Sequence, residues 1–452
     1  MNPSVYYCII SLFIISPISF NSGLLTTNTT LPSETDNEPK KLSSDGEKQS
    51  TKTNDKLYTS RRLTVQNFMI IWLDSNIDES DNDYQNSLSR LRAIVNTVYT
   101  FPNTDQCIHF VNQIKDEKVF LILSDDLVQS TVPLFHDMSQ VDSIYVFSKN
   151  NSKYEQSTKS WTKIKDMFTR IDPILDALKR DAQQCERDSL AFSITSGSLY
   201  RLDPMFLYTY LLKKILIEIK HDSNAKKEFA DFCRKQYRNN SHELQKINAF
   251  ERDYHLDTAI WWYTQKCFIY QMLNRALRTQ EIEVIMKMDY FVRDLQRQIE
   301  ELHSKKIRNS SPFIVYRGQS ISNIDLERIK TTSKGDLLAF NNFLTAGLNK
   351  KVALQFARNS LHNPDLVGIL FNITINTSIS TNPFVSRRQV DAFTNEKEVI
   401  LFSIYTVFRI ADIKPLENRL WKVELTLMGD DDQKQLLQRI RKETSKSTGW
   451  QR

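Results

Sequence analysis

Glycine is scarce in this 452-residue chain, which contains nine where about 7% would be ordinary. No two of them have the spacing GxGxxG, GxSxG, or GxxxxGK followed by Ser or Thr, the loops that cradle a phosphate or form a nucleophile elbow. The seven histidines and five cysteines show no CxxC, HxxxH or HExxH pattern. Rossmann, P-loop and α/β-hydrolase chemistry therefore lose support, and we expect no metal.

The chain also lacks a strong charge bias. Its net charge is +6, from 60 basic and 54 acidic residues, whereas nucleic-acid binders usually concentrate more positive charge. Hydrophobic residues at 40% and aromatics at 11% supply enough apolar surface for folded cores. We expect a mostly globular protein of two or three domains that does not bind nucleic acid.

Charged side chains are missing from the first 33 residues, which include an apolar run over 5–20. Residues 1–25 have the length of a signal peptide and are short for a stable membrane span. Because no Lys or Arg precedes the run, a buried or anchoring N-terminal segment is the alternative. Cleavage would predict a secreted or extracellular protein, and the other location is the cytoplasm. Four cysteines would then remain, which permits two disulfides in three possible pairings.

Composition divides the rest of the chain. Residues 26–62 are polar and predict a solvated linker. Residues 63–195 alternate apolar and helical stretches, which predicts a small α/β domain, flavodoxin-like or receiver-like, of unknown role. Its expected strands are 65–74, 118–124 and 143–148, and its expected helical stretches are 88–98, 107–114 and 161–178.

Acids follow two of these expected strands, namely Asp74 and the pair Asp125 and Asp126. They suggest a phosphorylation or metal pocket, since such sheets bind ligands at the carboxyl ends of their strands. Helix capping and loop solvation are the simpler explanation, which we favour in the absence of a supporting histidine or lysine arrangement.

Residues 200–430 change from long helical periods to short β-rich runs, which predicts an α+β domain. Residues 431–452 are expected to be a charged C-terminal tail. An aromatic stripe in the helical half suggests core packing more than a ligand cage; it comprises Trp261, Trp262, Tyr263, Phe268 and Tyr270. The expected helices are 204–219, 258–278 and 281–303, and the expected β-runs are 313–316, 366–375, 398–409 and 421–428.

Three pieces of the last third carry the chemistry. FIVYRGQ (313–319) places Arg317 at the end of a strand, with Gly318 allowing a close backbone approach. A guanidinium there can hold a phosphate with two bonds. NNFLTAGLNKKVA (341–353) offers the hydroxyl of Thr345 at the end of a short strand, followed by a helix.

The third piece is FTNEKEVILF (393–402), in which Glu396 and Glu398 open an apolar strand. Side chains two residues apart in a strand point to the same face, so both carboxylates address one spot. Such a pair suits a positively charged substrate. A bare ExE is more often a pair of solvated acids, so the pair is informative only together with the other two pieces.

An arginine, a hydroxyl loop and ExE in this order resemble the arginine-specific mono-ADP-ribosyltransferase family. The resemblance implies an α+β fold with a helical subdomain and a β-rich NAD-binding core, and NAD+ as a substrate with no metal. It further implies an acceptor protein with an exposed arginine, to which ADP-ribose is transferred as nicotinamide leaves.

The resemblance also implies roles for single residues. Arg317 grips the NAD phosphates, and Glu398 is the catalytic glutamate that stabilises the positive ribose. Glu396 engages the acceptor arginine, and Thr345 supplies a hydroxyl near the catalytic acid, although Ala346 and Gly347 follow where the family usually has Ser-Thr-Ser. The other expected cofactor-binding residues are Tyr316, Gly318 and Phe343.

Two other functions stay open at this point. An NAD glycohydrolase on the same fold would release free ADP-ribose, although ExE favours transfer to an acceptor. A catalytically degenerate NAD-binding scaffold is the non-enzymatic alternative, and retention of Arg317, Glu396 and Glu398 together weighs against it.

Overall fold

The computed structural model describes residues 66–148, 161–189, 191–196, 202–219, 224–265, 267–305, 311–380, 382–386 and 399–447. Residues 64–452 form one compact unit. The expected signal-like segment and polar linker lie outside the described residues, as do Glu396 and Glu398.

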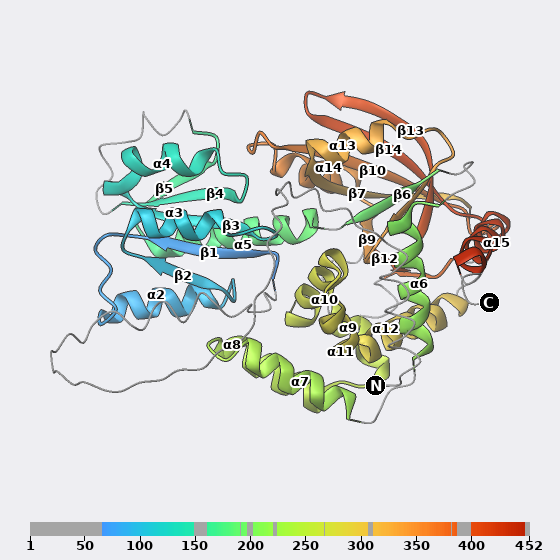
Figure 1. Ribbon diagram of the computed structural model, residues 1–452, viewed down its shortest axis with the longest axis horizontal. Helices are drawn as coiled ribbons and strands as arrows, with labels where there is room; N and C mark the ends of the chain where they lie inside the picture. The colour runs from blue at the N-terminus through green and yellow to red at the C-terminus, as the bar shows by residue number, and fades with distance from the viewer. Residues whose placement is uncertain are drawn as a thin grey trace, which may run out of the picture. The chain divides into compact units, whose positions relative to one another are not determined.

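The first sheet is parallel and has five strands in the described residues (Figure 1). Their order is β2-β1-β3-β4-β5, which is the flavodoxin-like order. The expected flavodoxin-like or receiver-like α/β region is therefore confirmed. The strands are β1 (Phe68–Leu73), β2 (Val98–Phe101), β3 (Lys118–Ser124), β4 (Val141–Phe147) and β5 (Ile164–Phe168).

Helices cover both faces of this sheet, because its central strands are apolar on both sides. Two helices, α2 and α5, pack with Phe68, Phe120 and Tyr145 on one face. Two others, α3 and α4, pack with Leu121 and Ile144 on the opposite face. The helices are α2 (Asn82–Arg92), α3 (Thr104–Asn112), α4 (Val128–His136) and α5 (Ile171–Asp188).

One expected helical stretch of this region, 161–178, is wrong in its first half. Residues Ile164–Phe168 form strand β5, and helix α5 begins only at Ile171. The strand lies at the edge of the sheet beside β4, and none of its five residues is fully buried. It therefore lacks the apolar run that identifies the inner strands.

The acids after β1 and β3 hydrogen-bond the loops around them. Asp74 accepts from the amide of Asn76 at 2.9 Å, and Asp125 accepts from the Ser148 hydroxyl at 2.6 Å. Asp126 accepts from the Ser75 hydroxyl at 2.9 Å. Within the described ranges, no group of three or more His, Cys, Asp or Glu side chains could hold a metal ion. Phosphorylation of these acids stays a hypothesis.

A helical segment follows at 204–304, and its helices begin and end at other residues than the sequence predicts. The expected helix 258–278 is split by Cys267, whose backbone is extended, and a left-handed Gln280 separates the next pair. The helices are α6 (Pro204–Glu218), α7 (Ala225–Gln236), α8 (Ser241–Asp253), α9 (Ala259–Thr264), α10 (Phe268–Thr279), α11 (Ile282–Lys287) and α12 (Asp289–Ser304).

The second sheet has nine strands in the described residues, in the order β11-β12-β9-β7-β10-β14-β13-β8-β6. Strands β10 and β14 pair in parallel, and the other neighbours are antiparallel. Strand β6, inside the range expected for the α/β domain, pairs with β8 in this sheet. The strands are β6 (Phe192–Thr195), β7 (Phe313–Ser322), β8 (Leu337–Phe340), β9 (Phe343–Gly347), β10 (Leu366–Ile375), β11 (Phe384–Ser386), β12 (Val399–Ile404), β13 (Val407–Glu417) and β14 (Leu420–Leu427).

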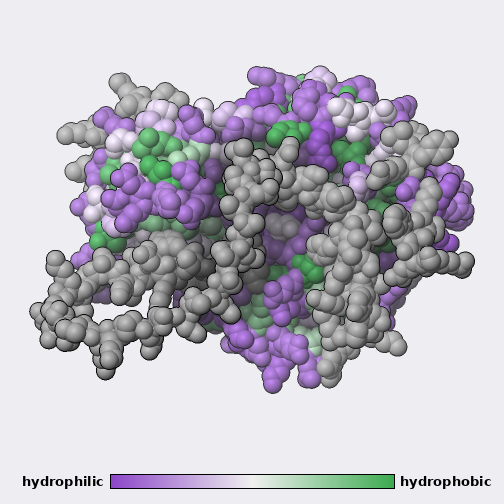
Figure 2. Space-filling model, in the orientation of Figure 1, coloured by the Kyte–Doolittle hydropathy of each residue, from purple (hydrophilic) through white to green (hydrophobic). Residues whose placement is uncertain are grey.

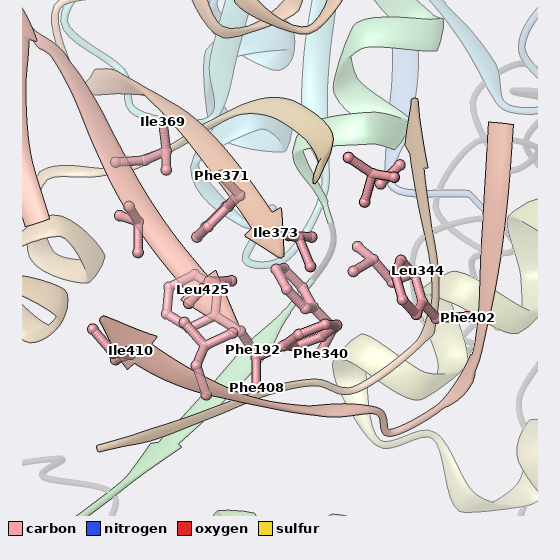
Figure 3. Close-up of a cluster of buried hydrophobic side chains, with 14 of the residues drawn as sticks. Phe192, Phe340, Leu344, Ile369, Phe371, Ile373, Phe402, Phe408, Ile410 and Leu425 are labelled. Carbon is pink, nitrogen blue, oxygen red and sulfur yellow. The ribbon is translucent and has the colours of Figure 1, made fainter. Parts of the chain in front are cut away.

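One hydrophobic core joins strands that lie far apart in this order (Figure 3). Phe340 of β8 contacts Phe371 of β10 and Phe408 of β13, and Phe408 also contacts Phe402 of β12. Because β8 and β12 stand near opposite edges of the sheet, the sheet must curve around this core. Three further helices complete the region: α13 (Asn323–Lys330), α14 (Lys350–Asn359) and α15 (Asp430–Ser447).

The C-terminal segment expected as a charged tail forms helix α15, which buries Leu436 and Ile440. On the face drawn in Figure 2, hydrophilic residues predominate and hydrophobic ones occur in small separate groups. No helix in the described part of the chain is long and apolar enough to cross a membrane. The described cysteines Cys107, Cys185, Cys233 and Cys267 are free thiols.

Candidate active site

Arg317 lies in the middle of the ten-residue strand β7, so the expected position at a strand end is wrong. Its side chain is 2% exposed. The Nε atom donates to the Gln319 carbonyl oxygen Oε1 at 2.9 Å, and Nη2 donates to the main-chain oxygen of Arg187 at 2.8 Å. The Nη1 atom donates to the main-chain oxygen of Thr345 at 2.9 Å and to its hydroxyl at 3.3 Å.

All these acceptors are uncharged, so Arg317 is a buried cation without an ion pair among the residues that the structure describes. Burial, and then the nearby guanidinium of Arg187, lower the pKa of Arg317 to about 10. The group still carries its charge at neutral pH. The charge of nearby Asp188 partly opposes this lowering without bonding the guanidinium. A buried charge costs several kcal/mol unless it is paired, so a bound anion would further stabilise this positive site.

Thr345 lies in β9, next to β12 in the sheet. It pairs with Leu401, and Gly347 pairs with Val399, the first described residue after the ExE pair. The structure therefore brings Arg317 and Thr345 together. Whether Glu396 and Glu398 join them stays a prediction, because both lie outside the described residues.

Gly318 lies where helix α14 approaches strand β7 too closely for any side chain. A Cβ atom there would lie 1.7 Å from the main-chain oxygen of Ala353 and 2.9 Å from the nitrogen of Ala357. Helix α14 thus packs directly on the backbone of β7, next to Arg317. The neighbouring Tyr316 is partly buried and pairs with Gly347 across to β9. Contact of either residue with NAD+ stays a prediction.

Aromatic side chains flank this arginine. Tyr263 is buried, and its hydroxyl donates to the Asn274 side-chain oxygen and to the main-chain oxygen of Phe343 at 3.1 and 3.2 Å. Its ring lies 5.1 Å from that of Tyr270 and 5.5 Å from that of Phe343. Burial raises the pKa of Tyr270, which the positive charge of Arg317 partly offsets. The aromatic stripe therefore contributes partly to the hydrophobic core and partly to the surroundings of Arg317.

Four residues of this site were missed from the sequence. Gln319 could have been found, since it stands two residues after Arg317 and so shares its face of the strand. For Tyr263 and Tyr270 the sequence favours core packing over a ligand cage. Arg187 precedes Arg317 by 130 residues, and no local pattern connects them.

Residues 211–433 match the model of a family described as NAD:arginine ADP-ribosyltransferase. They are an ADP-ribosyltransferase domain. The resemblance inferred from Arg317, Thr345 and the ExE motif is confirmed, as is the expected α+β fold. Enzymes of this family use NAD+ as a substrate. No curated protein compared with this chain matches it.

Solved structures of bacterial ADP-ribosyltransferases resemble the chain. Vis toxin from Vibrio splendidus is 16% identical, over 48% of this chain and 90% of that one, with a TM-score of 0.29. Exoenzyme S from Pseudomonas aeruginosa, solved with human 14-3-3 protein beta and carba-NAD, is 18% identical over 45% and 88%, with a TM-score of 0.30. C3stau2 from S. aureus, solved with NAD, is 16% identical over 39% and 89%, with a TM-score of 0.27.

Proposed function

We propose that this protein transfers ADP-ribose from NAD+ to arginine side chains of an acceptor protein and releases nicotinamide. The observation that carries the proposal is the buried guanidinium of Arg317, which makes no ion pair with a described carboxylate. A dinucleotide diphosphate supplies the missing negative charge, and a guanidinium holds phosphate oxygens with directed hydrogen bonds.

The acceptor side of the proposal rests on the ExE motif. Strand β12 begins at Val399, directly after Glu398, and pairs with the strand that carries Thr345. This pairing supports a location of the two glutamates near Arg317 and Thr345. Two carboxylates favour a cationic acceptor such as arginine.

Each proposed residue then has one role. The glycosidic C–N bond of NAD+ breaks, and neutral nicotinamide leaves with the bonding electrons. Glu398 stabilises the positive charge that develops on the ribose. A guanidine nitrogen of the acceptor forms the new C–N bond at the same carbon, and Glu396 accepts its proton.

Two glutamine variants separate these roles, with Glu417→Gln as the matched control because Glu417 is 52% exposed and pairs with Arg358. The full chain is incubated with labelled NAD+ and agmatine, and both nicotinamide release and label transfer are measured. Glu398→Gln should lose both activities. Glu396→Gln should lose transfer and keep NAD+ hydrolysis, and the control should equal the wild type.

Equal loss of both activities in the two variants would contradict this division of roles. Nicotinamide release without transfer by the wild type would indicate a glycohydrolase. NAD+ binding without turnover would indicate a degenerate scaffold.

We also propose that residues 1–25 direct secretion, which their uncharged, apolar sequence supports. Expression in a secreting cell, followed by N-terminal sequencing of the protein from the medium, tests this. A protein that stays in the cells with Met1 in place would contradict it.

A further inference from the structure

The C-terminal turn of helix α5 is joined to two elements of the transferase domain. Asp188 accepts from the Ser320 amide of β7 at 2.6 Å and from the hydroxyl of Ser360, the residue after α14, at 2.8 Å. Gln184, one turn earlier, donates to Asp188 at 2.9 Å and to the main-chain oxygen of Phe356 at 3.1 Å. The turn therefore links β7 to the end of α14.

The turn also takes part in holding the key arginine. The main-chain oxygen of Arg187 accepts from Nη2 of Arg317, and the Arg187 guanidinium lies 3.6 Å above the ring of Phe356. Asp188 is the next residue along the chain. Its hydrogen bonds thus fix the position of a carbonyl that orients Arg317.

The sheet explains why a helix end is needed here. Strands β7 and β9 pair only at Tyr316 and Gly347 within their described residues, so the amide of Ser320 has no strand partner on that side. Asp188 supplies the acceptor that β9 does not. A carboxylate that accepts an amide hydrogen bond is worth more than a neutral acceptor.

We propose that Asp188 is a positioning residue, which fixes the part of β7 around Arg317 and thereby the orientation of that guanidinium toward NAD+. The inference rests on the proposed function. Under this proposal, helix α5 packs on the first sheet and also helps to orient Arg317 in the transferase domain. The proposal therefore predicts that the α/β region supports NAD+ binding.

The surroundings of Asp188 fit this role. Burial raises the pKa of Asp188 to about 6, and its hydrogen bonds from Ser320, Gln184 and Ser360 oppose that rise. Asp142 on β4 and Arg317 on β7 interact electrostatically with it, and Arg187 is the residue before it. The carboxylate is partly buried, and both of its oxygens accept hydrogen bonds.

Kinetics on the full chain test the proposal, with nicotinamide release as the readout. Asp188→Ala removes every bond of the carboxylate, whereas Asp188→Asn keeps an oxygen for the Ser320 amide and almost the same shape. Asp176→Ala, which removes a carboxylate 67% exposed on the same helix, is the matched control. Each variant is also combined with Arg317→Lys.

Asp188→Ala should raise KM for NAD+ about tenfold, the loss expected for one charged hydrogen bond, and should lower kcat less. Asp188→Asn should raise KM about threefold, and Asp176→Ala should leave it unchanged. If Asp188 acts through Arg317, the substitutions are not additive. Asp188→Asn should then raise KM no further once Arg317→Lys is present.

The inference is overturned if Asp188→Asn matches the wild type, or if its effect persists in full beside Arg317→Lys. The second outcome would indicate general destabilisation rather than positioning. Should Asp188→Ala not fold, Asp188→Asn decides alone. A wild type that neither binds nor cleaves NAD+ would instead refute the proposed function.

Discussion

Arg317 and Thr345 are joined twice, because the same Nη1 atom donates to the main-chain oxygen and to the hydroxyl of Thr345, at 2.9 and 3.3 Å. This contact joins β7 to β9 near the point where the two strands stop pairing. The hydrogen bond to the main-chain oxygen does not depend on the side chain at position 345. Only the hydrogen bond to the hydroxyl can therefore be tested by substitution.

Thr345→Val keeps the branched shape of the side chain and removes its hydroxyl. We expect kcat/KM for NAD+ to fall about fivefold, which corresponds to one hydrogen bond of roughly 1 kcal/mol. Thr345→Ser keeps the hydroxyl and should stay close to the wild type. Steady-state rates of nicotinamide release measure both. Equal rates for the valine and serine variants would show that the hydroxyl is not used.

Arg317→Lys keeps the positive charge and loses the planar set of donors. A lysine cannot reach Gln319, Arg187 and Thr345 at once, so the charge loses its fixed orientation. We expect KM for NAD+ to rise about 100-fold. Arg409→Lys, at a half-exposed ion pair with Asp432, is the control and should not change KM. A normal KM in Arg317→Lys would remove Arg317 from the NAD+ site.

Much of the fold could be predicted because many strands are continuous apolar runs. The expected strands 118–124 and 366–375 agree residue for residue with β3 and β10. Strand β5 was missed because an edge strand needs no such run. The break between α9 and α10 was missed because helical spacing continues across Cys267, where backbone geometry alone ends the pattern.

The site could be predicted where its residues share a short segment, as in FIVYRGQ. Asp188 could not, because its partners Ser320 and Ser360 lie 132 and 172 residues further along the chain. An acid near the end of a helix looks like surface solvation until the tertiary fold shows what it contacts. Gly318 is predicted from the sequence to be a point of close backbone approach, and the structure places helix α14 there, whereas its contact with NAD+ stays a prediction.

Asp188 should make stability depend on pH. Burial raises its pKa to about 6 from an ordinary 3.8, so the folded protein binds this proton more tightly than the unfolded chain does. The stabilisation of the folded state by this proton is therefore complete below pH 3.8 and is lost as the pH rises through 6. Asp188→Asn cannot titrate. The free energy of unfolding of the wild type, relative to this variant, should fall by up to roughly 3 kcal/mol between pH 4 and pH 7.

Urea denaturation of both proteins at the two pH values measures this difference. Burial lowers the pKa of His362, so this residue favours folding at higher pH and acts in the opposite direction. It is present in both proteins and cancels in the comparison. Parallel pH profiles would show that Asp188 keeps an ordinary pKa.

Gly318 and Gly368 lie on the neighbouring strands β7 and β10 and face the same helix. A Cβ atom at Gly318 would meet the main-chain oxygen of Ala353 at 1.7 Å, and one at Gly368 would meet that of Ala357 at 2.2 Å. Both obstacles are backbone atoms, so no side chain can rotate aside. Either alanine variant must move α14, which should cost at least about 1–3 kcal/mol.

Chemical denaturation of Gly318→Ala and Gly368→Ala measures that cost. Gly429→Ala is the milder comparison, because its Cβ would lie 3.2 Å from the main-chain oxygen of Ile379, a tight contact without overlap. Gly318→Ala should also raise KM for NAD+ more than Gly368→Ala does, since Gly318 adjoins Arg317 in the chain. Helix α14 packs on β7, which carries Arg317, and begins three residues after β9, which carries Thr345. A displacement of α14 should therefore disturb both sides of the Arg317–Thr345 contact. If both alanine variants are as stable as Gly429→Ala, helix α14 can move at little cost. The packing of α14 on β7 would then not hold Arg317 in a fixed position.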